Sequence, residues 1–250
     1  MAERASATRE TIRISGKNLG AFALPDACKR CLWTKMRLQH RMPFTFFPGI
    51  FSSIDSYSKR VVHDHFDQHK CPPKWLEPIG DLVGYREPPH WSRFQMLDED
   101  HQILLTGAPD GVFVRHDGSL VIADYKTARH TVAQDALRPM YEVQLNAYAL
   151  IAESIGMGTV SGLALVYTEP MTEVLDANGA GINDAGFDMR FDAHVVHIDR
   201  DEDSITSLLH QVRTLVDRSA PPPPLDGCRD CHQVEALIQL LHRAKRRRKT

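Results

Sequence analysis

The hydrophobic positions in the first half of the chain repeat with two different periods. Residues 27–39 and 50–67 carry apolar side chains every three to four positions, which is the spacing of an amphipathic helix. Residues 102–106, 111–115 and 120–125 are short apolar runs rich in β-branched and aromatic residues, which is typical of strands. An Asp-Gly pair lies between the last two runs. It predicts a β-hairpin at the centre of the sequence.

The second half of the chain alternates between helical and extended patterns. Its predicted helices are 140–155, which begins at Pro139 and ends at Gly156, then 204–218 and 232–248, and its predicted strands are 160–168 and 187–198. The segments expected to be irregular are 1–20, which is polar and at best partly ordered, 42–49, 71–91, 169–186 and the proline spacer 221–224. This order predicts an α/β fold in which helices cover the faces of a mixed sheet.

Composition narrows the class of protein. A chain of 250 residues that is 42% hydrophobic and 25% charged can bury a substantial core, so it is neither disordered nor fibrous. Its apolar runs are shorter than the roughly 18 residues of a membrane span, and residues 1–17 contain no signal-peptide core. We therefore expect a soluble, cytoplasmic protein with no membrane partner.

The net charge of −2 conceals an uneven distribution. Residues 243–250 hold six Lys or Arg and no acid, so residues 1–242 carry 24 basic and 32 acidic side chains, a net of −8. A basic tail on an acidic body is either an arm that binds phosphates or a solvated terminus.

Four of the five cysteines form two C-x-x-C pairs, which are Cys28 with Cys31 and Cys228 with Cys231. Two residues between thiolates allow both sulfurs to bind one metal from a single turn. Two pairs supply the four soft ligands of tetrahedral zinc or an iron–sulfur cluster. The alternative is two unrelated pairs of ordinary cysteines. Cys71 has no evident partner.

The hairpin carries the residues with the clearest chemistry. Asp110 precedes one strand, and Asp124 and Lys126 end the other, where alternation places both on one face. Oxygen ligands from Asp110, Asp124 and the backbone carbonyl of Tyr125 suit Mg²⁺ or Mn²⁺. Such a site predicts metal-assisted phosphodiester hydrolysis, in which Lys126 orients the attacking water or offsets charge on the phosphate. The alternative is turn chemistry at a solvated hairpin end.

Three strings in order, G-x-P-D, D-Y-K-T and Q-x-x-x-Y, resemble the RecB-type branch of the PD-(D/E)XK nuclease superfamily, which includes the CRISPR-associated adaptation nucleases. Asp110 matches the aspartate of the family's PD, and Asp124 and Lys126 match its D/E-x-K. Gln144 and Tyr148 match its downstream helix motif and lie on one helix face. The resemblance implies that Gln144 and Tyr148 also face the active site and touch DNA or the lysine.

The resemblance implies a restriction-endonuclease-like fold with a mixed central sheet flanked by helices. The nuclease domain would span 27–235, after a polar segment at 1–26 and before a helical basic tail at 236–250. Iron–sulfur members of the branch join both chain ends to a [4Fe–4S] cluster, so the four cysteines would form a metal staple between the N- and C-terminal segments. Those members place one cysteine before the core and three after it, whereas this chain has two and two. Structural Zn²⁺ is therefore the alternative.

A second departure concerns the family's metal-binding histidine on the helix before the sheet. Asp55 stands at that position in this chain, while His63 and His65 lie further along the same predicted helix. An aspartate can bind Mg²⁺ as well as a histidine can, so Asp55 is the candidate ligand. The alternative is an ordinary exposed carboxylate.

The functional expectation is a Mg²⁺- or Mn²⁺-dependent deoxyribonuclease, with exonuclease favoured over endonuclease and single-stranded DNA among its substrates. Basic residues near Cys28 and the tail from Arg243 are the expected phosphate contacts. One alternative is a catalytically silent nuclease fold that binds DNA or protein, and another is a purely structural zinc protein.

Overall fold

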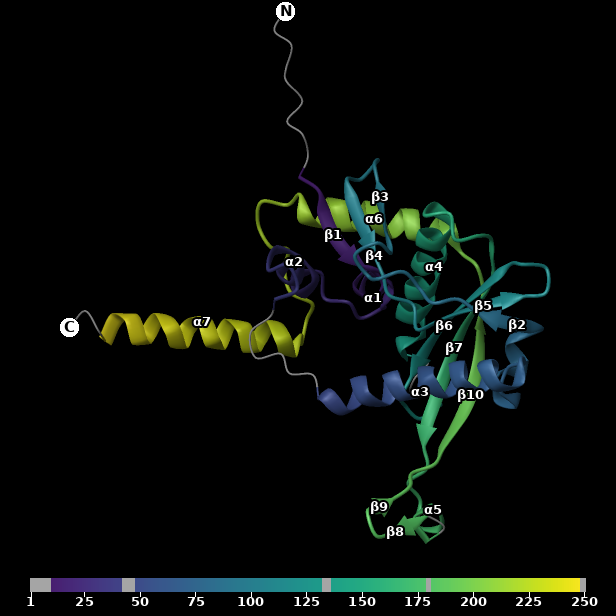
Figure 1. The fold of residues 1–250 in the computed structure, drawn as a ribbon. Coiled ribbons are helices and arrows are strands. Elements are labelled where there is room, and N and C mark those ends of the chain that lie inside the picture. Colours follow the sequence, from purple (N-terminus) through teal and green to yellow (C-terminus); the bar gives the residue numbers. More distant parts are fainter. Residues whose placement is uncertain (1–9, 42–47, 132–135, 179–180, 248–250) are drawn as a thin grey trace, which may run out of the picture.

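The computed structural model describes residues 10–41, 48–131, 136–178 and 181–247. Its main feature is a five-stranded sheet with the order β10-β7-β6-β5-β2 (Figure 1). The strands are β2 (Leu82–Tyr85), β5 (Gly111–Arg115), β6 (Leu120–Lys126), β7 (Val160–Pro170) and β10 (Phe191–Ile198). Strands β6 and β7 are parallel and the other neighbours are antiparallel. The sheet is therefore mixed, and the hairpin predicted from the Asp-Gly pair is confirmed as β5–β6.

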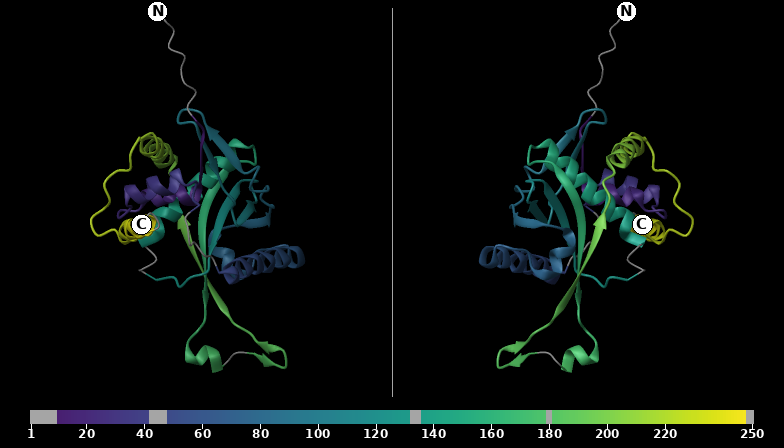
Figure 2. Two further views of the ribbon diagram at one scale, coloured as in Figure 1. Left: turned by 90° about the vertical axis from the view of Figure 1, so that its left-hand side faces the viewer. Right: turned by 90° about the vertical axis from the view of Figure 1, so that its right-hand side faces the viewer.

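Helices cover both faces of this sheet, as Figure 2 shows edge-on. Helices α4 (Arg138–Ser154) and α6 (Glu202–Val216) lie on one face, and α3 (Gly49–His69) with the 3₁₀ helix η2 (Lys74–Ile79) lies on the other. Side chains along β6 alternate between the two layers, so that Ile122 packs with the α4 layer and Val121 with the α3 layer. Each such fully buried aliphatic side chain contributes about 1.5–3 kcal/mol.

A second, three-stranded sheet contains a part of the chain that the sequence led us to expect as loosely ordered. Its order is β1-β4-β3, with β1 (Ile12–Ser15), β3 (Gln95–Asp98) and β4 (Ile103–Thr106). Helices α1 (Gly16–Gly20) and η1 (Ala21–Ala23) follow β1. The expectation for residues 1–20 is wrong from Ile12 onward, because Ile14 and Leu19 are fully buried in the core. A four-residue strand and a one-turn helix are too short to show a period.

The proline-rich segment 71–91 is also more regular than expected, since it holds η2 and the edge strand β2. Of its prolines, Pro78 lies inside η2. Pro73 precedes η2, where its missing N–H costs nothing, and β2 itself contains no proline.

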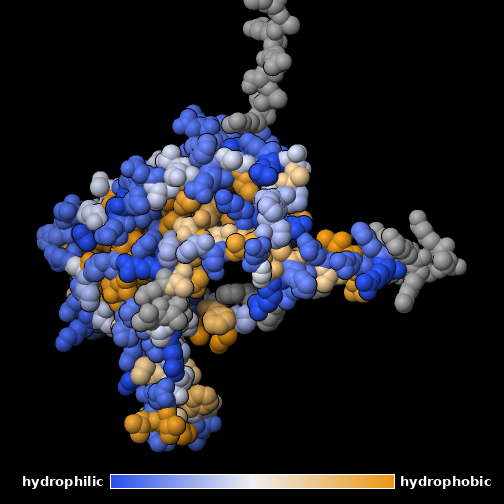
Figure 3. Space-filling model, turned by 180° about the vertical axis from the view of Figure 1, so that it is seen from behind, coloured by the Kyte–Doolittle hydropathy of each residue, from blue (hydrophilic) through white to orange (hydrophobic). Residues whose placement is uncertain are grey.

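Strands β7 and β10 extend beyond the body as a two-stranded arm (Figures 1 and 2). The tip of the arm lies in the predicted loop 169–186 and contains α5 (Val174–Asn178), β8 (Ile182–Asn183) and β9 (Gly186–Phe187). Hydrophobic residues gather at this tip (Figure 3), where Leu175 and Phe187 are largely exposed. The last long strand begins at Phe191, four residues later than predicted.

Helices α2 (Lys29–Arg37) and α7 (Arg229–Arg247) come from the two ends of the chain and meet beside the body, from which α7 projects (Figure 1). Residues 42–47 of the predicted loop and 248–250 of the basic tail lie outside the described residues. Within the described residues, no helix combines the length and hydrophobicity needed to cross a membrane.

Candidate active site and cysteine cluster

The β5–β6 hairpin brings two carboxylates to the same end of the sheet. Gly111 pairs with Ala123, so Asp110 and Asp124 stand opposite each other, one residue further along. Oδ2 of Asp110 accepts a hydrogen bond from the backbone N–H of Tyr125 at 2.9 Å. Asp124 is 3% exposed and lies on the face that α4 covers. The pairing that the sequence predicted is therefore present.

The glycine of the G-x-P-D string, Gly107, lies very close to the side chain of Tyr148. A Cβ atom on Gly107 would lie 2.5 Å from the ring of Tyr148, which no side chain can occupy. The chain can pass Tyr148 only with glycine at this position, and three residues later it presents Asp110. Gly107 thus couples the loop before β5 to helix α4.

Helix α4 holds the far side of the site through Gln144. Its side-chain amide donates to Oδ1 of Asp124 at 2.9 Å and to the hydroxyl of Tyr148 at 2.8 Å, and its Oε1 accepts from Nζ of Lys126 at 3.3 Å. Lys126 also forms an ion pair with Asp124, and its Nζ lies 4.2 Å from the ring centroid of Tyr141. The Q-x-x-x-Y face therefore meets the D-x-K pair directly.

Helix α3 contributes a residue that the sequence analysis did not single out. Nζ of Lys59 lies 2.8 Å from Asp110 and 2.9 Å from Asp55, and so it bridges the two carboxylates. The sequence carried a signal for half of this arrangement, because Asp55 and Lys59 are spaced i and i+4 on a predicted helix. The contact with Asp110 depends on how α3 packs on the sheet.

The environment shifts the pKa values of several groups at the site. Burial and the nearby charge of Asp124 raise the pKa of Asp110, although Lys59 opposes the shift. Burial alone would lower the pKa of Lys59, but the charges of Asp110 and Asp55 outweigh burial and raise it. Burial and the charge of Asp124 also raise the pKa of Tyr148, so its hydroxyl stays protonated at neutral pH.

These side chains surround a cavity of about 490 Å³. Its chemistry-bearing lining consists of Lys17, Asp55, Asp110, Asp124, Lys126 and Gln144. Lys17 on α1 was missed because its segment was expected to be poorly ordered. None of the three histidines of α3 lines this cavity: His63 stacks on Tyr85 and contacts Glu87, and the ring of His65 lies against that of His69. Asp55, and not a histidine, is therefore the candidate ligand of α3 that lines this cavity.

The donor set fits a hard divalent cation. Asp110 and Asp124 both line the cavity, and the buried Oδ2 of Asp124 has no hydrogen-bond partner among the described residues, although it meets the Lys126 ammonium as an ion pair. In this structure Lys59 and Lys126 offset the charge of the carboxylates. Binding of a cation would replace part of that compensation.

The four cysteines form a second centre. Sγ of Cys31 lies 3.4 Å from that of Cys231 and 3.5 Å from that of Cys228, and Sγ of Cys28 lies 3.6 Å from that of Cys231. All four sulfurs lie within 4.8 Å of one another, and among the described residues they are the only group of three or more His, Cys, Asp or Glu that does so. The N- and C-terminal segments therefore meet through one compact group of sulfurs, as predicted.

Protonation within this cluster is uneven. Burial would raise the pKa of Cys28, but hydrogen bonds from the backbone, including the N–H of Leu225, outweigh it and lower the pKa to about 6. Burial raises the pKa of Cys231 to about 11, and it also raises that of Cys31. A lowered pKa at Cys28 favours the thiolate form in which a cysteine binds a metal.

Comparison with known proteins bears on both centres. The model of the PD-(D/E)XK nuclease superfamily matches residues 23–235, which include the hairpin, α4 and all four clustered cysteines. Among solved structures, one described as "Crystal structure of SSO0001" is similar, with 13% identity and a TM-score of 0.38 over 86% of this chain and 81% of that one. No curated protein matches.

Proposed function

Because the chain belongs to the PD-(D/E)XK nuclease superfamily, we propose that it is a Mg²⁺- or Mn²⁺-dependent deoxyribonuclease of the RecB-type branch, acting as an exonuclease. The observation that carries this proposal is the convergence of Asp110, Asp124 and Lys126 in one cavity, with Gln144 contacting both members of the D-x-K pair.

Each residue has a role that follows from its position. The bound cation would act as a Lewis acid on the scissile phosphate and lower the pKa of a bound water. Asp110 and Asp124 would hold that cation together with the backbone carbonyl of Tyr125. Lys126 orients the attacking water and offsets negative charge on the phosphate. Gln144 fixes the positions of the Asp124 and Lys126 side chains through its hydrogen bonds to both.

Asp55 and Lys59 complete the site from α3. The ammonium of Lys59 is shared by Asp55 and Asp110, so it compensates the carboxylates when no cation is bound. Asp55 lines the same cavity and can supply a further oxygen ligand, directly or through water.

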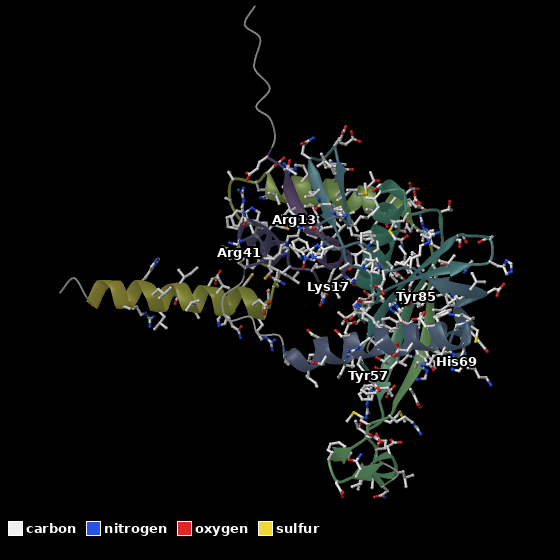
Figure 4. The ribbon with its side chains drawn as sticks, viewed as in Figure 1. Arg13, Lys17, Arg41, Tyr57, His69 and Tyr85 are labelled. Atoms are coloured by element: carbon white, nitrogen blue, oxygen red, sulfur yellow. The ribbon has the colours of Figure 1, made fainter. Side chains whose placement is uncertain are left out.

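A basic cavity beside the site supplies a path for the DNA backbone. This cavity of about 550 Å³ is lined by Arg13, Arg37, His40 and Arg41, and by Asn18, which adjoins Lys17 of the active-site cavity. Figure 4 shows Arg13 by β1, Arg41 beside α2 and Lys17 by α1, all on the side of α3 away from the arm. Cations so placed would bind the phosphates next to the one that is cut.

The spacing of the cysteine sulfurs favours zinc over the [4Fe–4S] cluster. Four sulfurs that each lie about 2.3 Å from a single tetrahedral zinc are about 3.8 Å apart. The sulfurs here come within 3.4–3.6 Å in the closest pairs. A four-iron cluster binds each thiolate to a different iron and needs a wider group. We propose a single structural Zn²⁺ that joins α2 to the start of α7.

The test is hydrolysis of single- and double-stranded DNA with and without Mg²⁺ or Mn²⁺. We expect metal-dependent degradation that proceeds from strand ends, and a loss on the order of 10³-fold in Asp110→Ala and Lys126→Ala. Asp64→Ala removes an exposed carboxylate from α3 and should retain activity. Activity retained in both site variants would refute the assignment. Tight DNA binding without turnover would favour the silent binding module.

A further inference from the structure

A second groove lies across α3 from the candidate active site. It has a volume of about 740 Å³ and runs between α3, η2 and strands β7 and β10. Its lining is largely apolar and aromatic, with Ile54, Tyr57, Val61, Trp75 and Phe191. Figure 4 shows Tyr57 on the side of α3 toward the arm, whereas Lys17 lies on the opposite side of the helix.

The groove and the active-site cavity share α3 as a wall. Ser52 and Asp55 line the active-site cavity, while Ser53 and Ile54 line the groove. The sheet places both at the same end, because Lys126 pairs with Tyr167 and the next residue of β7, Thr168, lines the groove. A strand of DNA held at Asp110 and Asp124 can therefore continue past α3 into the groove.

The groove contains polar groups for which an apolar ligand would supply no hydrogen-bond or ion-pair partner. Thr168 is 6% exposed, and its buried hydroxyl has no hydrogen-bond partner among the described residues. Such a group costs free energy until a ligand pairs with it. Arg60 also lines the groove and forms no ion pair within the described part of the chain.

Aromatic faces together with a free cation and an unpaired hydroxyl are the features of a site for an unpaired base. Tyr57 is 60% exposed, so its ring offers a surface on which a base can stack. Arg60 can bind the adjoining phosphate, and Thr168 can pair with a polar edge of the base. A protein segment with an apolar side chain would satisfy neither Arg60 nor Thr168.

We propose that this groove binds a nucleobase of an unpaired DNA strand next to the nucleotide that is cut, so that the substrate must have a single-stranded segment. This inference rests on the proposed nuclease function. It adds a base-binding subsite between α3 and β10 that accepts all four bases, because every base has a π-face, with a preference among them that depends on Thr168.

The test is an abasic scan of binding without added Mg²⁺ or Mn²⁺, so that cleavage does not interfere. Single-stranded oligonucleotides that each lack one base are titrated against the full chain, and fluorescence anisotropy gives the Kd. We expect one position, or two neighbouring ones, at which loss of the base weakens binding about 5-fold or more. In Tyr57→Ala that dependence should disappear, while Tyr57→Phe, which keeps the ring, should retain it.

Two further variants sharpen the result. Thr168→Val keeps the shape of the side chain but removes the hydroxyl, so it should narrow the differences in Kd among the four bases at the sensitive position. Phe187→Ala removes an exposed aromatic ring from the tip of the arm and should leave the scan unchanged.

The outcomes separate this inference from the nuclease proposal. A flat scan in the wild type, or an unchanged dependence in Tyr57→Ala, would overturn the subsite even if the protein cuts DNA with Mg²⁺. Failure both to bind and to cut DNA would instead overturn the proposed function, and the subsite with it.

Discussion

The two candidate metal centres of this protein are built from opposite kinds of ligand and opposite kinds of structure. The carboxylate centre uses oxygen atoms at the end of the central sheet, around an open cavity of about 490 Å³. The cysteine centre uses four sulfurs within 4.8 Å of one another, brought from the two ends of the chain. Hard oxygen ligands suit Mg²⁺ or Mn²⁺, and soft thiolates suit zinc.

The difference lies in what each centre does without its metal. The carboxylates have Lys59 and Lys126 as built-in counterions, so the cavity keeps its shape and can release a cation. Among the described residues, the cysteine sulfurs have only one another and a few backbone donors as partners, and α2 and α7 meet at this cluster. We infer that the open centre performs chemistry and the compact one stabilises the fold.

Removal of a cysteine should have the largest effect, because it should lower stability while leaving the nuclease rate of the folded protein nearly unchanged. Cys231→Ser takes one sulfur from the compact centre, so we expect loss of bound zinc and a fall in Tm of about 10 °C. The nuclease rate per folded molecule should stay within about twofold, because the two centres occupy different parts of the fold. Scanning calorimetry, elemental analysis and a nuclease assay on the same preparation measure the three quantities.

Cys71→Ser is the matched control, since Cys71 is exposed and lies outside the cluster. It should change neither Tm nor zinc content. A brown wild-type preparation with several irons per chain would contradict the zinc assignment. A nuclease rate that falls in parallel with zinc content in the folded Cys231→Ser protein would contradict the division of roles.

Removal of a positive charge beside the carboxylate centre should have a smaller effect, on the salt dependence of DNA binding. Arg13→Gln and Arg41→Gln each remove one cation from the cavity that adjoins Lys17. Each should reduce the slope of log K against log salt by about 1 without changing zinc content. Lys70→Asn, at the far end of α3, should leave the slope unchanged. Equal slopes in all four proteins would exclude this cavity from the DNA path.

The sequence predicted the parts of the site that depend on local pattern. Alternation along one strand placed Asp124 and Lys126 together, and the i, i+4 spacing placed Gln144 and Tyr148 on one helix face. The C-x-x-C pairs predicted a shared sulfur cluster, although only the three-dimensional spacing of the sulfurs favours one metal ion.

What the sequence could not predict depends on contacts between distant segments. Lys59 reaches Asp110 only because α3 packs on the sheet, and Lys17 reaches the cavity only because β1 joins β4. The strand Ile12–Ser15 is stabilised by its parallel pairing with β4 and not by any period of its own. Tertiary contacts thus give the N-terminal segment a regular structure that its polar composition does not predict.

The smallest effect should appear when the carboxylate centre is altered in the absence of metal. Because burial and Asp124 raise the pKa of Asp110, the folded protein holds the charged carboxylate less well than the unfolded chain does. Asp110 therefore costs stability at neutral pH, and this cost disappears as the pH falls below the ordinary value of about 3.9. At pH 7 without added Mg²⁺ or Mn²⁺, Asp110→Asn should melt about 2 °C above the wild type.

The same measurement at pH 4, and again with Mg²⁺ at pH 7, completes the comparison of the two centres. The advantage of Asp110→Asn should shrink at the lower pH, and Mg²⁺ should raise the Tm of the wild type more than that of the variant, because only the wild type has both carboxylates. A variant that melts below the wild type without added Mg²⁺ would show that the Lys59 ion pair outweighs burial and the repulsion from Asp124. In that case both centres, and not the cysteine centre alone, would stabilise the fold when the carboxylate centre holds no cation.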